Sequence, residues 1–169
     1  MGSGTKQGAA STFLYDTLYR IHHHLFQDSE DFYRALANSF MLSGDNAHAV
    51  HPHHVEKTDQ DNCVYMNQGV VVKSHAGQKY TSDAVSIAIF KVFCEKANVP
   101  VQFFANRSDA AGGSTLGNIA MSQVSMNGVD IGLPQLAMHS SYETAGIKDT
   151  YYMVKVMEEF FNSHIEEVN

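Results

Sequence analysis

Five side chains with the chemistry of metal ligands lie close together between residues 43 and 54. They are one carboxylate, Asp45, and four imidazoles, His48, His51, His53 and His54. Asp45 follows an apolar run, 40–42, which predicts the end of a buried strand, and open α/β sheets place their chemistry just beyond such ends. Carboxylate and neutral imidazole are also ligands of divalent metals in hydrolytic sites. The pattern predicts Asp45 as a metal ligand, with a turn-capping role as the alternative.

The remaining histidines give weaker signals. For His53 and His54 a solvated turn is the favoured interpretation, because both follow Pro52. The run 22–24 would spread around more than one face of a helix, so its three rings cannot converge on one ion, and we interpret it as a solvated helix end. His139 stands alone on a loop edge, and the pattern around it favours a structural role over a catalytic one.

Two further stretches could contact a substrate. Lys73 ends a β-branched run, 69–73, and is either a surface lysine with a buried stem or a functional cation. Gly112, Gly113, Ser114 and Thr115 follow a predicted strand and precede a predicted helix. Glycines let a ligand approach the backbone closely, and a helix N-terminus favours an anionic group. A purely structural turn is an equal alternative for this second stretch.

The elements that would position these residues alternate between strand and helix. Strands are predicted at 39–42, 69–73, 99–104 and 129–133, and residues 134–137 read as a connector. Helices are predicted at about 9–25, from Asp28, from Ser82 or Asp83, at 116–124 and at 148–164, and the first should bury Phe13, Leu14, Leu18, Ile21 and Leu25. This alternation predicts an α/β fold: a mixed, mainly parallel sheet with helices on both faces. No boundary divides residues 1–169 into two domains.

Composition narrows the function classes. Hydrophobic residues make up 44% and charged residues 17% of the 169 residues, as in globular domains. The formal net charge is −7 with no basic block, which argues against nucleic acid as the main partner. No apolar run is long enough to span a bilayer, and no signal peptide is visible. We therefore expect a cytoplasmic protein with no membrane partner, in which Cys63 and Cys94 are reduced thiols.

Four motifs in series resemble one known family. They are GSGTKQGA at 2–9, DNAHAVHP at 45–52, NRSD at 106–109 with GGSTLG at 112–117, and DIGLPQLAMHS at 130–140. Together they resemble the M18 peptidases, the aspartyl aminopeptidases, and most closely their bacterial members. The resemblance runs nearly end to end and in the right order.

The resemblance implies a zinc-exopeptidase fold, phosphorylase/hydrolase-like, with two zinc ions. It implies a cytoplasmic homo-oligomer that removes N-terminal Asp or Glu from peptides by two-metal hydrolysis. Carried onto this chain, it makes Asp45 and His139 metal ligands, and Lys73 the cation that meets the acidic substrate side chain. His48 would help to shape the site, and Gly113–Thr115, with Ser114 between them, would form part of the substrate-binding wall.

The chain also departs from the family pattern. The family has two adjacent glutamates just before the GSGTKQG motif, one the catalytic base and the other a metal ligand, and here Met1 takes that place. No catalytic residue of the family is therefore present, and we expect a partial domain without the upstream portion and the dimerisation domain. Ala110 and Ala111 replace what is usually Met-Pro. We expect at most one weak zinc site and no turnover by this chain alone.

Two other functions stay open from the sequence. One is a non-catalytic oligomerising module that kept the fold and lost the chemistry. The other is a histidine-rich metal-binding protein that uses His48, His51, His53 and His54. The second is the weaker, because the family motif at 45–52 already accounts for much of this stretch.

Overall fold

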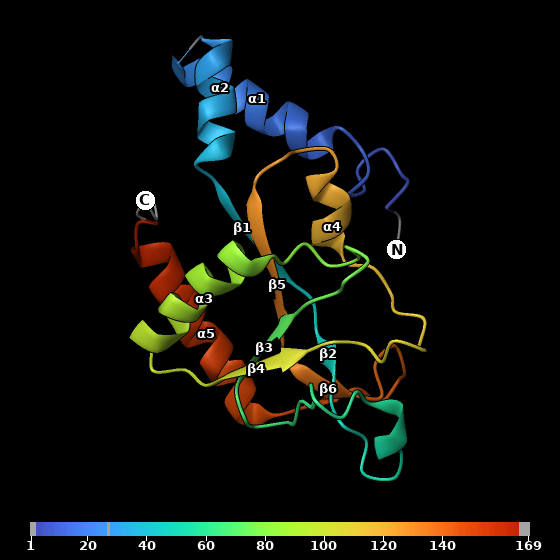
Figure 1. Cartoon of the computed structure of the whole chain (residues 1–169). Coiled ribbons are helices and arrows are strands. Elements are labelled where there is room, and N and C mark those ends of the chain that lie inside the picture. The colour runs from blue at the N-terminus through green and yellow to red at the C-terminus, as the bar shows by residue number, and fades with distance from the viewer. Residues whose placement is uncertain (1–2, 27, 166–169) are drawn as a thin grey trace.

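The computed structural model describes residues 3–26 and 28–165, so Gly2 of the first motif lies outside the described residues. It confirms the α/β class: a mixed sheet with helices on both faces (Figure 1). The main sheet has the order β1 (Phe40–Gly44), β5 (Asn127–Gly132), β3 (Val70–Lys73) and β4 (Val101–Phe104). The β1–β5 and β3–β4 pairs are parallel, and β3 pairs with β5 in the antiparallel direction. The four strands predicted from the apolar runs are thus all present, within a few residues.

A second, smaller sheet continues the chain beyond the ends of β1 and β5. It contains β2 (Ala47–His48), β6 (Pro134–Leu136) and β7 (Thr144–Ala145), in the order β2-β6-β7. The expected connector at 134–137 was therefore wrong, because Pro134 pairs with Ala47 and begins a strand. A strand this short has no periodicity to read, and a proline at its first position hides it further.

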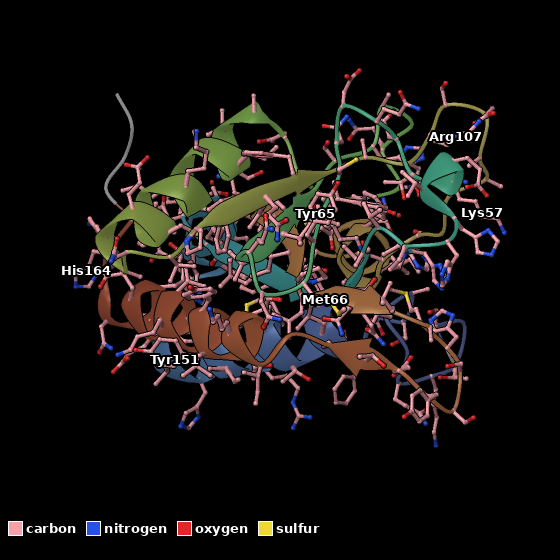
Figure 2. The ribbon with its side chains drawn as sticks, turned by 90° about the horizontal axis from the view of Figure 1, so that it is seen from below. Lys57, Tyr65, Met66, Arg107, Tyr151 and His164 are labelled. Carbon is pink, nitrogen blue, oxygen red and sulfur yellow. The ribbon has the colours of Figure 1, made fainter. Side chains whose placement is uncertain are left out.

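One face of the main sheet carries the larger apolar core. Helices α3 (Ala84–Lys96) and α5 (Ile147–Asn162) lie on it (Figure 1). Val70 and Val72 of β3, with Val129 and Ile131 of β5, join their buried side chains in this core. Figure 2 shows Tyr151 on the outer side of α5, away from the sheet. Every second residue of these strands thus points into this core, and the residues between them point to the other face of the sheet.

The opposite face is covered by loops and by one short helix, α4 (Leu116–Met121), which contacts β1 and β5. A 3₁₀ turn, η1 (Val55–Lys57), lies in the loop after β2. A smaller apolar cluster fills this side with Ala47, Val64, Val71, Tyr80 and Phe104. The helical cover is thus unequal, with two long helices on one face and a single short one on the other.

Capping residues start two helices as expected. The Asp28 side chain accepts a hydrogen bond from the Glu30 N–H at the start of α2 (Ser29–Ala37). Asp83, rather than Ser82, caps α3, and its carboxylate and the Ser86 hydroxyl form a reciprocal capping box.

The expected apolar stripe of the first helix was wrong. Helix α1 (Phe13–Phe26) buries no residue, and Phe13, Ile21 and Leu25 are all more than half exposed. The helix contacts α2 through Tyr15, Leu18 and Tyr19, at the end of the molecule where α1 and α2 lie (Figure 1). No helix within residues 3–26 and 28–165 is long and apolar enough to cross a membrane.

Candidate active site

A hollow of about 360 Å³ lies where β1 and β3 end. Its lining includes every residue to which the family resemblance assigns a metal or a substrate: Asp45, His48, Lys73, Gly113, Ser114, Thr115 and His139. The sheet register explains the meeting of β1 and β3. Gly44 of β1 and Val72 of β3 both pair with Ile131, so the ends of β1 and β3 flank the same part of β5. The fold therefore assembles one site from four distant segments: 45–48, 73, 113–115 and 139.

Gly132 permits the close approach that holds Asp45. A Cβ atom at this position would lie 2.1 Å from the Asp45 carbonyl oxygen and 2.7 Å from the Asn46 Cα. Only a residue without a side chain fits there. The Leu133 N–H, one residue on, donates to the Asn46 Oδ1 at 3.1 Å. The DIG motif thus fixes the backbone on which the candidate ligand stands.

Lys73 lies at the floor of the hollow and is only 3% exposed. Its Nζ donates to the Asp45 Oδ2 at 3.1 Å and to the Asn46 carbonyl at 3.2 Å. It also lies 4.7 Å from the centroid of the Tyr80 ring, a cation–π contact. The alternative of a surface lysine is therefore wrong: the ammonium group is buried and compensated by a carboxylate, two backbone carbonyls and an aromatic face.

His48, at the end of β2, and His139, in the loop after β6, both line the hollow. Burial lowers the pKa of His48, and the charge of Lys73 lowers it further, while Asp45 opposes both. The imidazole is thus held neutral, the form in which histidine binds metals. His139 is exposed and has a left-handed backbone with φ of 66°, and its N–H donates to the Glu143 carboxylate at 2.6 Å.

The wall 113–115 is tied to the sheet by a buried carboxylate that sequence reasoning missed. Asp130 is fully buried in β5, and its Oδ2 accepts from the Thr115 hydroxyl at 2.8 Å and from the Thr81 N–H at 2.6 Å. Its backbone N–H donates to the Ser82 hydroxyl at 2.9 Å. Gly113 and Ser114 stay exposed toward the hollow. An aspartate inside an apolar strand was the available signal, because such a group is buried only with partners.

Tyr80 and Asn46 were also missed. The Tyr80 hydroxyl accepts from the Asn106 amide at 3.0 Å, and burial of the ring raises its pKa. Asn46 Nδ2 donates to the Gln135 Oε1 at 2.6 Å, which joins β2 to β6 across the back of the site. Neither residue type carries a chemical signal by itself, so only the fold could assign them.

The donor set is too small to complete a metal centre by itself. No group of three or more His, Cys, Asp or Glu side chains within residues 3–26 and 28–165 could hold a metal ion. Asp45 and His139 line the same hollow, yet a closed zinc site needs about four ligands and an open one three. Among these described residues, the His48, His51, His53 and His54 stretch forms no such group either.

Comparison with known proteins places this site in a family. The family model described as aminopeptidase I zinc metalloprotease (M18) matches residues 1–161. A probable M18 family aminopeptidase 2 of Clostridium novyi is 52% identical over 162 residues, which are 96% of this chain and 37% of the relative. A probable aspartyl aminopeptidase of Ricinus communis is 38% identical over 98% of this chain and 34% of its own length.

Solved structures agree with this placement. A chain in the structure of the Ape4 and Nbr1 complex superposes with a TM-score of 0.91 and 39% identity, over 95% of this chain and 30% of that one. The S. cerevisiae mApe1 dodecamer superposes with a TM-score of 0.80 and 27% identity, over 95% of this chain and 35% of that one. The fold is that of part of an M18 aminopeptidase, and this chain spans little more than a third of the curated relatives it matches.

The chain belongs to the M18 family of metallopeptidases.

Proposed function

We propose that this chain forms part of the proteolytic domain of an aminopeptidase that removes N-terminal Asp or Glu from peptides. The observation that carries the proposal is the single hollow that holds Asp45, His139, Lys73 and the wall 113–115. The family match and the likeness to a probable aspartyl aminopeptidase support it. The free thiols Cys63 and Cys94 support a reducing compartment such as the cytoplasm.

Asp45 and His139 are proposed as two ligands of a zinc centre. Carboxylate oxygen and imidazole nitrogen are both zinc ligands, and zinc supplies Lewis-acid polarisation of the scissile carbonyl in this class of site. The family centre holds two ions, but the described residues offer only this pair, so we propose one weak site here. A peptidase site also needs a base that takes a proton from the attacking water. Asp45 and His139 are both proposed as zinc ligands, so neither can also act as this base. The chain alone is therefore proposed to be inactive.

Lys73 is proposed to select acidic substrates. Its ammonium group is buried, and its one carboxylate partner is Asp45. If Asp45 serves a metal, that partner is weakened, and a buried cation then requires another anion. The side-chain carboxylate of an N-terminal Asp or Glu, entering along the exposed Gly113 and Ser114, would supply it. His48, neutral and beside Lys73, would shape the same pocket.

Assembly into a homo-oligomer is proposed by analogy, because the mApe1 relative is a dodecamer. A non-catalytic oligomerising or metal-binding module is the second candidate. The small donor set favours its oligomerising form, because no group of three or more His, Cys, Asp or Glu side chains among residues 3–26 and 28–165 could hold a metal ion.

Zinc binding and turnover by the purified chain test the proposal together. We expect isothermal titration to give one weak zinc site that Asp45→Ala and His139→Ala each abolish, while His53→Ala, in the exposed turn, leaves it intact. Aspartyl-anilide hydrolysis with added zinc, cobalt or manganese should stay at background, because loss of the base alone removes a factor of about 10²–10⁴. Zinc affinity unchanged in Asp45→Ala would refute the ligand assignment, and turnover that Asp45→Ala abolishes would refute inactivity.

A restored chain tests the specificity. With the N-terminal part of the Clostridium novyi relative fused upstream, Lys73→Ala should lower kcat/KM for Asp and Glu substrates by about 1.5–3 kcal/mol, the range for hydrogen bonds to charged groups. A leucyl substrate should change much less. Equal losses for both substrates would exclude Lys73 as the selecting residue.

A further inference from the structure

A second hollow of about 620 Å³ adjoins the candidate active site. The two share four lining residues, His48, Phe104, Asn106 and Ala111, so they form one continuous depression. The second hollow lies between the loop after β2, which contains η1, and the loop after β4. Its volume lies in the range of small-ligand sites, about 300–1,000 Å³. A peptide whose first residue enters the active site must send its next residues out through a neighbouring space of this kind.

The charges in the second hollow are unevenly compensated. Arg107 is paired with Asp109 by two hydrogen bonds, at 2.6 and 2.9 Å, and its charge also lowers the pKa of Asp59. The Asp59 carboxylate further accepts from Asn62 at 2.9 and 3.0 Å and from the Asp61 N–H at 3.1 Å. Both carboxylates therefore have partners in their own loops, and the Arg107 guanidinium is bound to Asp109.

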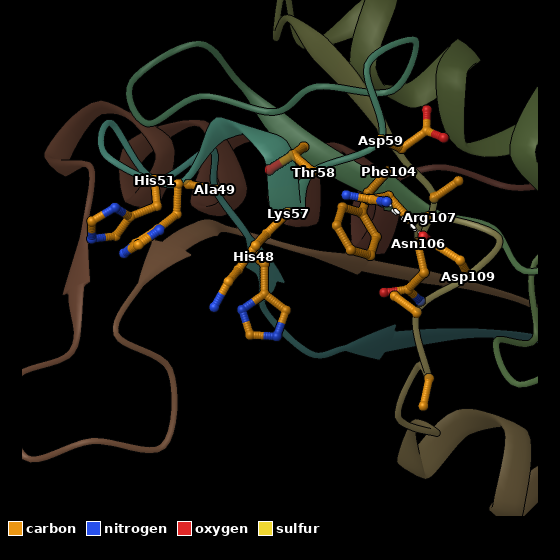
Figure 3. Close-up of a pocket in the computed structure, with 14 residues that line it drawn as sticks. His48, Ala49, His51, Lys57, Thr58, Asp59, Phe104, Asn106, Arg107 and Asp109 are labelled. Carbon is orange, nitrogen blue, oxygen red and sulfur yellow. Dashed lines mark hydrogen bonds and ion pairs between the residues drawn. The ribbon is translucent and has the colours of Figure 1, made fainter.

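Lys57 is different. Within residues 3–26 and 28–165 its ammonium group has no ion pair and no side-chain hydrogen bond. It extends from η1 into the hollow on the same side as His48 (Figure 3). Figure 2 shows Lys57 and Arg107 at the same end of the molecule, opposite His164. The hollow thus contains one cation without a direct ion pair among the described residues, and its charge acts on the exposed Glu56 carboxylate of the same turn.

One imidazole, that of His51, adds a hydrogen-bond donor on the same side, and the His54 ring lies next to it. His51 Nδ1 accepts from the His53 N–H at 3.2 Å, so the neutral ring carries its proton on Nε2, which remains free to donate. The His54 ring lies 5.1 Å from the His51 ring, and its Nδ1 lies 3.2 Å from the Glu56 carboxylate. The His54 N–H is thus used by Glu56, and the ammonium group of Lys57 with the His51 N–H beside it can recognise a carboxylate.

We propose that the second hollow receives the residue that follows the scissile bond of the peptide, and that Lys57 favours a carboxylate there. The carboxylate would be the side chain of Asp or Glu at the second position, or the free C-terminus of a dipeptide. This inference rests on the proposed aminopeptidase function, which places the first residue beside Lys73. It predicts that peptides with two acidic residues in sequence bind better than peptides with one.

The test is peptide binding to the purified chain, followed by two-dimensional ¹H–¹⁵N NMR. The probes are the C-terminal amides of Asp-Glu and Asp-Gln, which have nearly the same shape and differ by one charge. We expect the Asp-Glu amide to bind about two- to fivefold more tightly at low salt, the range for an exposed ion pair, with the advantage reduced at high salt. Shifts should concentrate on the amides of 54–58 and 105–107. Lys57→Met should remove the advantage.

Lys91→Met is the matched control, because it makes the same charge change on α3 at an exposed residue that lines neither hollow. It should keep the full preference for the Asp-Glu amide. Equal affinities of the two amides for the unmodified chain, or a preference that survives Lys57→Met, would overturn the proposal. The free dipeptide Asp-Gln should bind more tightly than its amide only if the C-terminal carboxylate reaches Lys57.

The experiments distinguish a failure of the second-residue site from a failure of the proposed function. If zinc binding depends on Asp45 and His139 while both amides bind equally, the second-residue site is wrong and the aminopeptidase assignment stands. If the Asp-Glu preference depends on Lys57 while zinc affinity ignores Asp45, the proposed function is wrong, and the inference that rests on it falls too.

Discussion

The two faces of the main sheet are built from the same strands, but one face buries apolar side chains and the other buries charged ones. On the face toward α3 and α5, β5 presents Val129 and Ile131, which are fully buried among apolar side chains. On the other face the same strand presents Asp130, equally buried but held by Thr81 and Thr115. β3 repeats the pattern, with Val70 and Val72 on one side and Lys73 on the other.

The contrast teaches where the stability and the chemistry of this domain reside. Apolar burial on the helical face stabilises the fold in proportion to the area removed from water, about 25 cal/mol per Å². Charged groups on the opposite face are buried at a cost, which their partners offset. Because a strand alternates its side chains, one short sequence can supply both faces, and the polar face remains available for ligands.

The largest expected effect on stability comes from truncating a buried side chain on the apolar face. Phe90 of α3 is fully buried in the core, so Phe90→Ala should destabilise the domain by about 3–5 kcal/mol through lost burial and the cavity left behind. Urea unfolding followed by circular dichroism measures this loss. Val92→Ala on the same helix, where the side chain is 48% exposed, should cost less than about 1 kcal/mol. Similar losses for both variants would contradict the assigned core.

A smaller and more local effect is expected on the polar face. Asp130→Ala leaves the Thr81 N–H and the Thr115 hydroxyl without an acceptor, so we expect a loss of about 2–3 kcal/mol. Hydrogen exchange should accelerate first at 79–82 and 113–117. Asp130→Asn keeps an oxygen where Oδ2 lies, and should retain more stability than the alanine variant. Exchange that accelerates equally across the whole sheet would show that Asp130 does not act locally.

The smallest expected effect is a difference in thiol reactivity, and it is measured on the unmodified chain. Cys94 lies in the apolar core of α3, where burial raises the pKa of its thiol to about 12, while Cys63 is half-buried in the loop before β3. At pH 8 only about one Cys94 in ten thousand is a thiolate, so labelling should wait for unfolding. A disulfide reagent such as DTNB should therefore modify Cys63 first. Two thiols labelled at the same rate in the native protein would show that the core is open.

Much of the fold could be predicted because its signals are local. The β-branched run at 70–72 and the caps Asp28 and Asp83 act within a few residues, and the structure contains the corresponding strand and helices. The first helix was misjudged, since an apolar stripe shows which face could be buried but not whether anything covers it. Strand β6 was missed because three residues carry no periodicity.

For the site, residue chemistry was sufficient to nominate Asp45, and the motifs that resemble the family added His48, Lys73, His139 and the wall 113–115. These nominations came from the types of the residues and from their order along the chain. Both are properties of the sequence itself.

Only the tertiary structure decided how those residues meet. The Lys73 ammonium lies on Asp45, 28 residues earlier, and Asp130 accepts from Thr81, 49 residues earlier. The Asp109 carboxylate binds Arg107, while Lys57, 50 positions before Arg107, has no ion pair among the described residues. Such contacts depend on sheet register and loop packing, which join residues without any local pattern, so the sequence could name the participants but not their partners.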